Sequence, residues 1–383
     1  MKVGLLIQHF PPYLGGAECQ ARDLAEALAQ RGHDVEVSTT RWDPAQPARE
    51  ERKGVLIHRC ITPSARWLKL PWNLLAGFAV GWRMAARCEI LHGHCLSPFV
   101  LGGLLAAHCR RRPMLVKICS MGPAGDIERL RRPWLFGLAW RLASSASAFV
   151  VQTEAVGDEL RVAGIRPDTI HCLPSLFPQA AQPPSEAQRD SFSDSQEVVF
   201  VGRLHPGKGL HTVMAAWPAL AKRSRWRWVI VGDGPMQGEI RDWIAREGLQ
   251  STVSLVGYQA DPGPWFQRAA VFVFPSRSES FGNVLVEALL HGCQVFTTDV
   301  GVVRDWPVDA PICRLPQAEP EAWEHALLAW ADLSPEERAH RHTRARVFAL
   351  EQHHPDVVLS RLEAVYQTLT GKAASTSRSG GLA

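Results

Sequence analysis

Short hydrophobic runs alternate along the chain with longer segments in which apolar residues return every three or four positions. The short runs are typical of β-strands and the longer segments of amphipathic helices. In the first half, the predicted strands are Val3–Ile7, Val35–Thr39, Val55–Arg59, Ile90–His92, Leu115–Ile118, Ala148–Val151 and Ile170–Leu173. The first predicted helix runs from about Gly16 to Arg31. Apolar strands of this length, separated by helices, indicate a mostly parallel sheet covered on both faces.

The alternation stops between Pro174 and Gln196, where Pro, Ser, Gln and Ala predominate, as is typical of a linker. It resumes with predicted strands at Val198–Val201, Trp228–Val231, Val253–Val256, Val271–Phe274 and Val295–Thr298. The first three of these are followed by Gly202, Gly232 and Gly257. Glycine at the carboxyl end of a parallel strand lets a ligand approach the backbone, and ligands of open α/β sheets bind at that edge.

We therefore predict an α/β protein with two doubly wound, Rossmann-like domains that face each other across a cleft. The first domain is predicted at 1–180, the linker at 181–197 and the second domain at 198–352. The segment 353–370 contains a helix from about Asp356, and it is expected to pack back on the first domain. Its apolar stripe consists of Val358, Leu362, Val365, Tyr366 and Leu369. Residues 371–383, rich in Ser, Gly and Ala, are predicted to be disordered.

Composition narrows the class of protein. The chain has 383 residues, of which 46% are hydrophobic, and a net charge of +4 that by itself does not indicate a nucleic-acid partner. The most apolar run, Leu70 to Trp82, is too short for the roughly 20 residues of a membrane span. The N-terminus enters a predicted strand directly, with no signal-peptide cleavage site. We expect a soluble cytoplasmic protein.

The nine cysteines include no Cys-x-x-Cys pair, so reduced, mostly buried thiols are expected rather than a disulfide framework. The run His92-Gly93-His94-Cys95 offers three metal ligands close together but no distant fourth. Zinc is therefore disfavoured, and no metal site is predicted.

The strongest local motif runs from Phe274 to Leu289, with a strand, a polar turn and a helix that starts near Gly282. Glu279 lies in the turn, and Glu287 shares a helical face with Asn283. The free N–H groups of Gly282, Asn283 and Val284 form an anion site at the helix start. The two carboxylates can bind sugar and ribose hydroxyls. A solvated Glu279 and a Glu287 that only favours helix formation are the alternative.

Two further motifs follow predicted strands. In Val201–Gly209, Arg203 and Lys208 can clamp a diphosphate, although a basic surface loop is the alternative. Gly15 and Gly16 open the first helix, where backbone N–H groups can approach a phosphate; alone, such a pair is usually only a turn. The turn is not G-x-G-x-x-G and lacks the acidic residue of dinucleotide sites, which disfavours a hydride-transfer cofactor.

In this order along the chain, the motifs resemble those of the retaining GT-B glycosyltransferases of family 4, also called glycosyl transferases group 1. The resemblance covers nearly the whole chain. It rests on the Gly-Gly-Ala-Glu turn, V-G-R-L…K-G, V-G-D-G-P at Val231–Pro235, and the E-x7-E pair Glu279 and Glu287, whose second member begins the run Glu287–Gly292.

The resemblance implies a nucleoside-diphosphate-sugar as co-substrate and neither metal nor other cofactor. Arg203 and Lys208 would hold the diphosphate, Glu287 the ribose, and Glu279 the transferred sugar. The implied donor-binding residues are Gly15, Gly16, Arg203, Lys208, Gly257, Ser280, Phe281, Gly282, Asn283, Val284 and Glu287. A donor phosphate oxygen would accept the acceptor's proton, so no dedicated side-chain base is expected.

Two segments depart from the family pattern. Many members carry a histidine that contacts the transferred sugar, but Lys117–Asp126 contains none. We therefore consider three substitutes for this histidine. Asp126 is a second catalytic candidate beside Glu279, and Ser120 and His94 are acceptor-side candidates. The family's Pro-Asn-Gly segment is replaced by Pro174-Ser175-Leu176.

Basic and aromatic residues alternate in Arg66–Trp72 and Arg129–Phe136, and Arg110–Arg112 adds charge. Such segments can rest on an anionic membrane, at the inner face of the cytoplasmic membrane; core helices with snorkelling cations are the alternative. The resulting hypothesis is a retaining glycosyltransferase that acts on a lipid-linked or polysaccharide acceptor in cell-surface glycan synthesis, lipopolysaccharide included. An inactive sugar-binding relative and a GT-B nucleotide-sugar epimerase are the alternatives.

Overall fold

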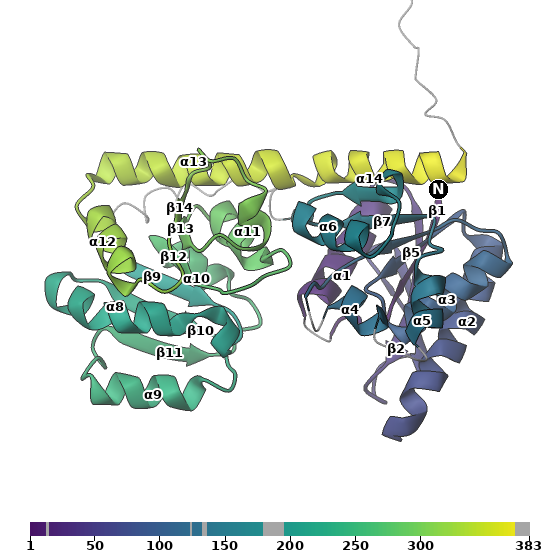
Figure 1. Cartoon of the computed structure of the whole chain (residues 1–383), viewed down its shortest axis with the longest axis horizontal. Coiled ribbons are helices and arrows are strands. Elements are labelled where there is room, and N and C mark those ends of the chain that lie inside the picture. Colours follow the sequence, from purple (N-terminus) through teal and green to yellow (C-terminus); the bar gives the residue numbers. More distant parts are fainter. Residues whose placement is uncertain (13–14, 123–124, 132–135, 179–194, 372–383) are drawn as a thin grey trace, which may run out of the picture. The chain divides into compact units, whose positions relative to one another are not determined.

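The computed structural model describes residues 1–12, 15–122, 125–131, 136–178 and 195–371. These residues belong to two compact units (Figure 1). Unit 1 is formed by Met1–Pro178 together with the segment that begins at Pro355, and unit 2 lies within Gln179–His354. Most of the predicted linker and the predicted disordered tail lie outside the described residues.

The sheet of unit 1 has eight strands in the order β3-β4-β2-β1-β5-β6-β7-β8. They are β1 (Lys2–Ile7), β2 (Asp34–Arg41), β3 (Arg49–Arg52), β4 (Val55–Ile61), β5 (Ile90–His94), β6 (Met114–Lys117), β7 (Ala148–Val151) and β8 (Ile170–Cys172). The neighbours pair in parallel except β3, which is antiparallel to β4. The hydrophobic pattern missed β3 because its sequence Arg-Glu-Glu-Arg is charged, as edge strands often are.

Helices cover both faces of this sheet (Figure 1). The helical segments of unit 1 are α1 (Gly16–Gln30), η1 (Arg66–Leu68), α2 (Lys69–Arg87), α3 (Pro98–Cys109), α4 (Asp126–Arg131), α5 (Phe136–Ala143), α6 (Glu154–Val162), η2 (Pro167–Thr169) and α14 (Pro355–Thr370). Leu5 of β1 packs in one core with residues of α1 and α14, and Leu6 packs in a second core with residues of α2 and α3. This division follows from the alternation of side chains along a strand.

The last helix, α14, belongs to the core of unit 1. Val358, Leu362, Val365 and Tyr366 are buried in it. The hydroxyl of Tyr366 lies 2.6 Å from Nδ1 of His92 on β5, so a polar contact joins the end of the chain to the centre of the sheet.

Helices α2 and α3 pack closely through glycine. A Cβ at Gly77 would lie 1.9 Å from the carbonyl oxygen of Phe99, and one at Gly102 would lie 2.0 Å from that of Leu74. Because larger residues cannot fit there, the register between the two helices is determined by these glycines.

Unit 2 contains a parallel six-stranded sheet in the order β11-β10-β9-β12-β13-β14. The strands are β9 (Glu197–Val201), β10 (Arg227–Val231), β11 (Val253–Gly257), β12 (Val271–Phe274), β13 (Gln294–Thr297) and β14 (Ile312–Arg314). The helical segments are η4 (Pro206–Lys208), α8 (Leu210–Arg223), α9 (Gln237–Arg246), α10 (Gly263–Arg268), α11 (Asn283–Leu290), η5 (Gly301–Arg304), α12 (Pro320–Ala331) and α13 (Pro335–His353). The hydrophobic pattern predicted all of these strands except β14, whose three residues are too few to give a recognisable pattern.

Each sheet has a point at which the strand order reverses. In unit 1 it lies between β1 and β5, and in unit 2 between β9 and β12. The loops that leave two such strands diverge to opposite sides and open a crevice at their carboxyl ends, where ligands of doubly wound sheets bind. Both crevices carry residues that the motifs singled out.

Candidate functional site

The crevice of unit 2 is built from the loop after β9 and the loop after β12. The backbone N–H of Arg277 donates to the carbonyl oxygen of Gly207 over 2.9 Å, and the Ser276 hydroxyl donates to the same oxygen over 3.3 Å. Gly209 has φ of 65°, and a Cβ on it would lie 2.0 Å from the carbonyl oxygen of Pro275. Only glycine fits at this position, so the two loops form one rigid surface.

Lys208 and Glu279 meet on this surface. The Lys208 Nζ lies 2.5 Å from Glu279 Oε1, which also accepts a hydrogen bond from the Ser276 hydroxyl over 2.6 Å. The ammonium stands over the ring of Phe274, 5.2 Å from its centre. The two charged side chains are 25% and 14% exposed, so both keep an open side toward a ligand. The structure thus brings together two residues that the sequence analysis assigned to a diphosphate and to a sugar.

Helix α11 points its N-terminus into the same loop. Gly282 caps it in the left-handed conformation, with φ of 92° and no side-chain hydrogen bond to the first turn. Its first N–H groups, around Asn283 and Val284, therefore remain available to an anion. Both of these residues are half-buried, and so is Glu287, one turn further along the helix. The structure therefore has a helix N-terminus, whose first N–H groups have no partner within the helix, at the place where the anion site was predicted.

The other predicted donor-binding residues differ in accessibility. Arg203 is exposed on the loop after β9, and Ser280 is half-buried beside Glu279. The side chain of Phe281 is buried, its ring edge-on to that of His353, and its carbonyl oxygen accepts from Val302 N–H over 2.9 Å. Phe281 can therefore offer a ligand only its backbone N–H.

Glycines line the carboxyl edge of β9, β10 and β11. A Cβ at Gly232 would lie 1.9 Å from the carbonyl oxygen of Gly202, and Gly232 N–H donates to Gly257 oxygen over 2.8 Å. Gly257 itself, with φ of 77°, has no neighbouring described atom where its Cβ would be. The edge is therefore open at Gly257, where the backbone can be approached by a ligand.

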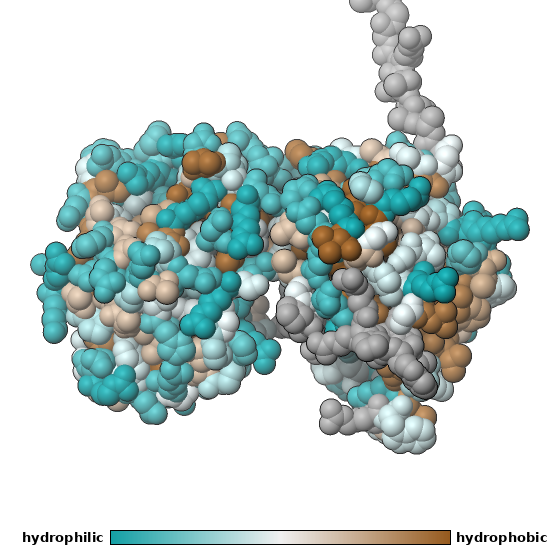
Figure 2. Space-filling view, viewed as in Figure 1, coloured by the Kyte–Doolittle hydropathy of each residue, from teal (hydrophilic) through white to brown (hydrophobic). Residues whose placement is uncertain are grey.

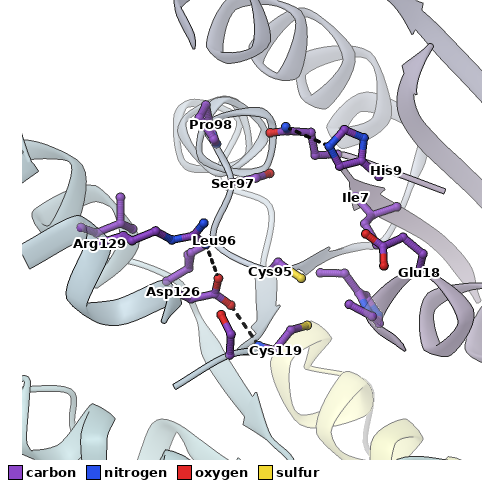
Figure 3. A pocket seen from close by; sticks show the side chains of 15 residues that line it. Ile7, His9, Glu18, Cys95, Leu96, Ser97, Pro98, Cys119, Asp126 and Arg129 are labelled. Carbon is purple, nitrogen blue, oxygen red and sulfur yellow. Dashed lines mark hydrogen bonds and ion pairs between the residues drawn. The ribbon is translucent and has the colours of Figure 1, made fainter. Parts of the chain in front are cut away.

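A pocket of about 530 Å³ occupies the crevice of unit 1 (Figure 3). It lies at the carboxyl ends of β1, β5 and β6 and beside the starts of α1 and α4. The predicted residues His94, Ser120 and Asp126 all line it. Gly15 and Gly16 stand at the N-terminus of α1, whose next two residues, Ala17 and Glu18, also line the pocket.

Asp126 is held on two sides within the pocket. Its Oδ2 accepts from the Cys119 N–H over 3.0 Å, and its Oδ1 accepts from Arg129 Nη2 over 2.7 Å (Figure 3). The carboxylate is almost fully buried. A Cβ on Gly15 would lie 2.2 Å from a carboxylate oxygen of Glu18, so Glu18 folds back over the helix start, where burial raises its pKa.

His94 has no exposed surface and stacks on His92 with 4.7 Å between ring centres. Burial lowers the pKa of both imidazoles, that of His92 to about 3, and the positive charge of Lys117 lowers both further. Both rings are therefore neutral at neutral pH. A neutral imidazole in a pocket can accept a hydrogen bond or donate one but carries no charge.

The sequence analysis assigned no role in a binding site to Ser276, Cys119, Glu18 or Arg129, and it considered Cys95 only in a disfavoured zinc site. All five residues belong to one of the two crevices. The signal that could have found them is position: each lies on a segment that follows β1, β5, β6 or β12 at the carboxyl edge of its sheet.

Two protein families match the chain, one on each side of the boundary between unit 1 and unit 2. Residues 14–175 match the family described as Glycosyltransferase Family 4, and residues 195–332 match that described as Glycosyl transferases group 1. Among curated proteins, the D-inositol 3-phosphate glycosyltransferase of Pseudarthrobacter chlorophenolicus is 27% identical over 78% of this chain and 79% of its own. The gpi3 subunit of the phosphatidylinositol N-acetylglucosaminyltransferase of Schizosaccharomyces pombe is 26% identical over 77% of this chain and 65% of its own.

Solved structures share the fold. HepE of Anabaena, in complex with UDP, superposes with a TM-score of 0.76 at 19% identity, covering 96% of this chain and 100% of its own. The sucrose-phosphate synthase of Thermosynechococcus elongatus superposes with a TM-score of 0.77 at 20% identity, over 97% and 100%. With two parallel α/β units and family matches in each, the chain belongs to the family 4 glycosyltransferases, also called glycosyl transferases group 1, and has the GT-B fold.

Proposed function

We propose that the protein transfers a sugar from a nucleoside-diphosphate-sugar to a lipid-linked or polysaccharide acceptor, with retention of the anomeric configuration. The observation that carries the proposal is the Lys208–Glu279 pair at the crevice of unit 2, beside the N-terminus of α11. A cation, a helix terminus and a carboxylate on one rigid surface match the phosphates and hydroxyls of such a donor.

The pair suggests how the donor is received. Without donor, Glu279 neutralises Lys208; an arriving diphosphate offers the ammonium a second, stronger anionic partner. Glu279 can then turn its lone pairs to hydroxyls of the sugar. Arg203 adds a cation on the exposed side of the loop, and Glu287 is placed for the ribose hydroxyls. Because Lys208, Arg203 and the α11 terminus all carry positive charge, the leaving diphosphate needs no metal ion.

The open glycine edge at Gly257 is where we place the base. The solved relative HepE was crystallised with UDP and with UDP-glucose, which favours a uridine nucleotide as the first donor to test. Retention would follow from attack on the same face as the leaving group, with a phosphate oxygen accepting the proton. In unit 1, the buried carboxylate of Asp126 and the hydroxyl of Ser120 would face the acceptor side.

A surface of unit 1 supports a membrane-bound acceptor. Helix α2 buries Asn73, Gly77 and Gly81 against α3 and turns its other face outward. The α2 surface is defined by its exposed large apolar residues, which are Trp67, Leu68, Leu70, Trp72, Leu74, Leu75 and Trp82. In Figure 2, brown residues gather over the part of unit 1 that α2 occupies in Figure 1. The exposure of Trp67, which is 79%, favours a membrane contact over a core helix for this segment.

Cations accompany this apolar surface, and we propose an anionic lipid membrane as its partner. Lys69 and Arg83 are exposed on α2, and the guanidinium of Arg110 stands 4.0 Å from the centre of the Trp82 ring. Aromatic residues at the acyl boundary with cations at the headgroups are typical of peripheral membrane binding. The predicted second segment extends over 132–135, which lie outside the described residues. No helix in the described ranges is long and apolar enough to cross a bilayer.

The decisive experiment is turnover. Nucleotide sugars are first screened by the thermal shift of the purified chain, and the best donor is then incubated with membrane lipid extract. Transfer is detected by mass spectrometry, and NMR of the product reports the anomeric configuration. Donor binding without turnover would identify an inactive relative. Conversion of the donor sugar without any acceptor would identify an epimerase.

A further inference from the structure

Two thiols and a carboxylate converge in the unit 1 pocket. Sγ of Cys95, Sγ of Cys119 and a carboxylate oxygen of Asp126 all lie within 4.8 Å of one another (Figure 3). They come from the end of β5, the segment after β6 and the start of α4. The Cys95 N–H donates to the Lys117 carbonyl oxygen over 3.0 Å, so strand pairing places the two cysteines side by side.

The three groups are set in fixed positions. Asp126 is anchored by the Cys119 N–H and by Arg129, and each of its oxygens keeps lone-pair capacity for a further partner. Cys95 adopts φ of 61°, a left-handed conformation that side chains other than glycine rarely take. A hydrogen bond with Cys119 and burial raise the pKa of the Cys95 thiol.

A fourth group faces the same pocket. His94 lines it with no exposed surface, and neither of its ring nitrogens has a hydrogen-bond partner among the residues that the structure describes. A fully buried imidazole without partners is costly, because a polar group out of water normally has one. Its neutral state leaves one nitrogen lone pair free to bind a cation directly or to accept from a bound water.

We propose that Cys95, Cys119 and Asp126 form a binding site for a thiophilic divalent cation of the zinc type, with His94 at the remaining position. Two thiolates with one carboxylate and an imidazole are a donor set that selects zinc-like ions over magnesium or calcium. In a tetrahedral site with Zn–S bonds of about 2.3 Å, sulfur atoms stand about 3.8 Å apart. The ligand atoms of Cys95, Cys119 and Asp126 lie within 4.8 Å of one another, so side-chain movements of about 1 Å would bring them to the spacing of such a site.

The protons and charges balance. Cysteine binds such an ion as thiolate, so binding releases the two thiol protons to solvent. The charges that face the cysteines are Glu18 and Asp126, which raise the pKa of Cys95 and favour a cation, and Lys117, which opposes one.

This site contains none of the proposed donor-binding residues, but it shares Asp126 with the proposed acceptor side. An ion bound there would hold Asp126 and occupy the pocket, so we expect it to inhibit transfer. Its test does not require the transfer reaction, so the two proposals can fail independently.

The experiment titrates Co²⁺ into the reduced, metal-free full chain and records absorption. We expect one ion per chain, with thiolate-to-cobalt charge transfer and the visible bands of a tetrahedral site, both displaced by Zn²⁺. Cys95→Ser and Cys119→Ser should each remove about half of the charge-transfer intensity, and Asp126→Asn should weaken binding about tenfold or more. Cys109→Ser, at an exposed thiol on α3, is the matched control and should change nothing.

Charge transfer of undiminished intensity in both the Cys95→Ser and Cys119→Ser variants, or none in the unaltered chain, would overturn the proposal. So would a chain that forms a Cys95–Cys119 disulfide in air and, once its thiols are restored by reduction, still does not bind Co²⁺. Circular dichroism and Tm establish that each variant is folded. If Cys95→Ser does not fold, Cys119→Ser and Asp126→Asn decide the question.

Discussion

The ammonium of Lys208 and the carboxylate of Glu279 lie 2.5 Å apart although the residues are 71 positions apart in the chain. The contact exists because β9 and β12 are neighbours in the sheet and their loops leave at the same edge. It joins the two motifs that had been assigned to opposite ends of one donor molecule.

Loss of either charged donor contact should abolish transfer without unfolding the chain. Lys208→Ala and Glu287→Ala should each cost about 2–4 kcal/mol of transition-state stabilisation, because a charged hydrogen bond in a closed site is lost. Rates at saturating donor measure this, with Lys222→Ala on α8 as a matched control. Near-normal turnover in either variant would contradict the assignment of that residue.

Gly209→Ala should weaken donor binding by separating the two loops. The new Cβ would lie 2.0 Å from the Pro275 carbonyl oxygen and would strain a backbone with φ of 65°. Isothermal titration with the nucleoside diphosphate should show the loss. Gly238→Ala on α9, where a Cβ meets no described atom, is the control and should bind normally. Equal affinity in both variants would mean that the loop junction does not shape the donor site.

Transfer should not slow in EDTA. The cations Lys208 and Arg203 and the N-terminus of α11 are expected to supply the positive charge that the leaving diphosphate needs. Initial rates with and without the chelator measure this directly. A fall in rate that Mn²⁺ or Mg²⁺ restores would show that a metal ion neutralises the diphosphate instead.

The α2 surface should bind anionic vesicles and release them in salt. Each cation near such a surface contributes about 1 kcal/mol, and Lys69→Glu should therefore weaken co-sedimentation. Trp67→Ser should weaken it as well, because the exposed ring can enter the acyl boundary. Val308→Ser removes an apolar residue that is 95% exposed in unit 2 and serves as the control. Binding that neither α2 variant changes would leave a soluble acceptor as the better hypothesis.

Acid should destabilise the protein through its buried histidines. The folded pKa of His92 is lowered to about 3 and that of His94 is lowered as well, whereas both lie near 6.5 in the unfolded chain. As pH falls below about 6.5, only the unfolded state gains these protons, so stability is lost at up to about 1.4 kcal/mol per pH unit for each histidine. Urea unfolding between pH 7 and pH 5 measures the slope.

A variant separates this effect from general acid sensitivity. His92→Asn should flatten the pH slope of the unfolding free energy even if it lowers the stability at pH 7. His340→Asn, at an exposed position on α13, should leave the slope unchanged. An unaltered slope in His92→Asn would mean that other groups dominate the acid response.

Much of the fold follows from the sequence because its determinants are local. Val3–Ile7 and Val271–Phe274 are continuous apolar runs. A short run of this kind is typical of a strand that is buried on both faces of a parallel sheet. Gly202 and Gly232 follow β9 and β10, and Gly257 ends β11, all three with positive φ values, a backbone conformation that glycine adopts most readily. The charged edge strand Arg49–Arg52 was not predicted because it has no apolar run. It is stabilised by pairing with β4 and not by burial of its side chains.

Only the tertiary structure decided which of these residues meet. The convergence of Cys95, Cys119 and Asp126 and the contact of Lys208 with Glu279 depend on strand order, which hydrophobic periodicity does not specify. The burial of His94 and the exposure of Trp67 likewise depend on what packs against β5 and α2. The sequence by itself determined the apolar strands, the helices that begin near Gly16, Gly282 and Asp356, and the donor motifs, because these signals lie within a few residues. The structure decided the partners, because contacts across a sheet edge join segments far apart in the chain.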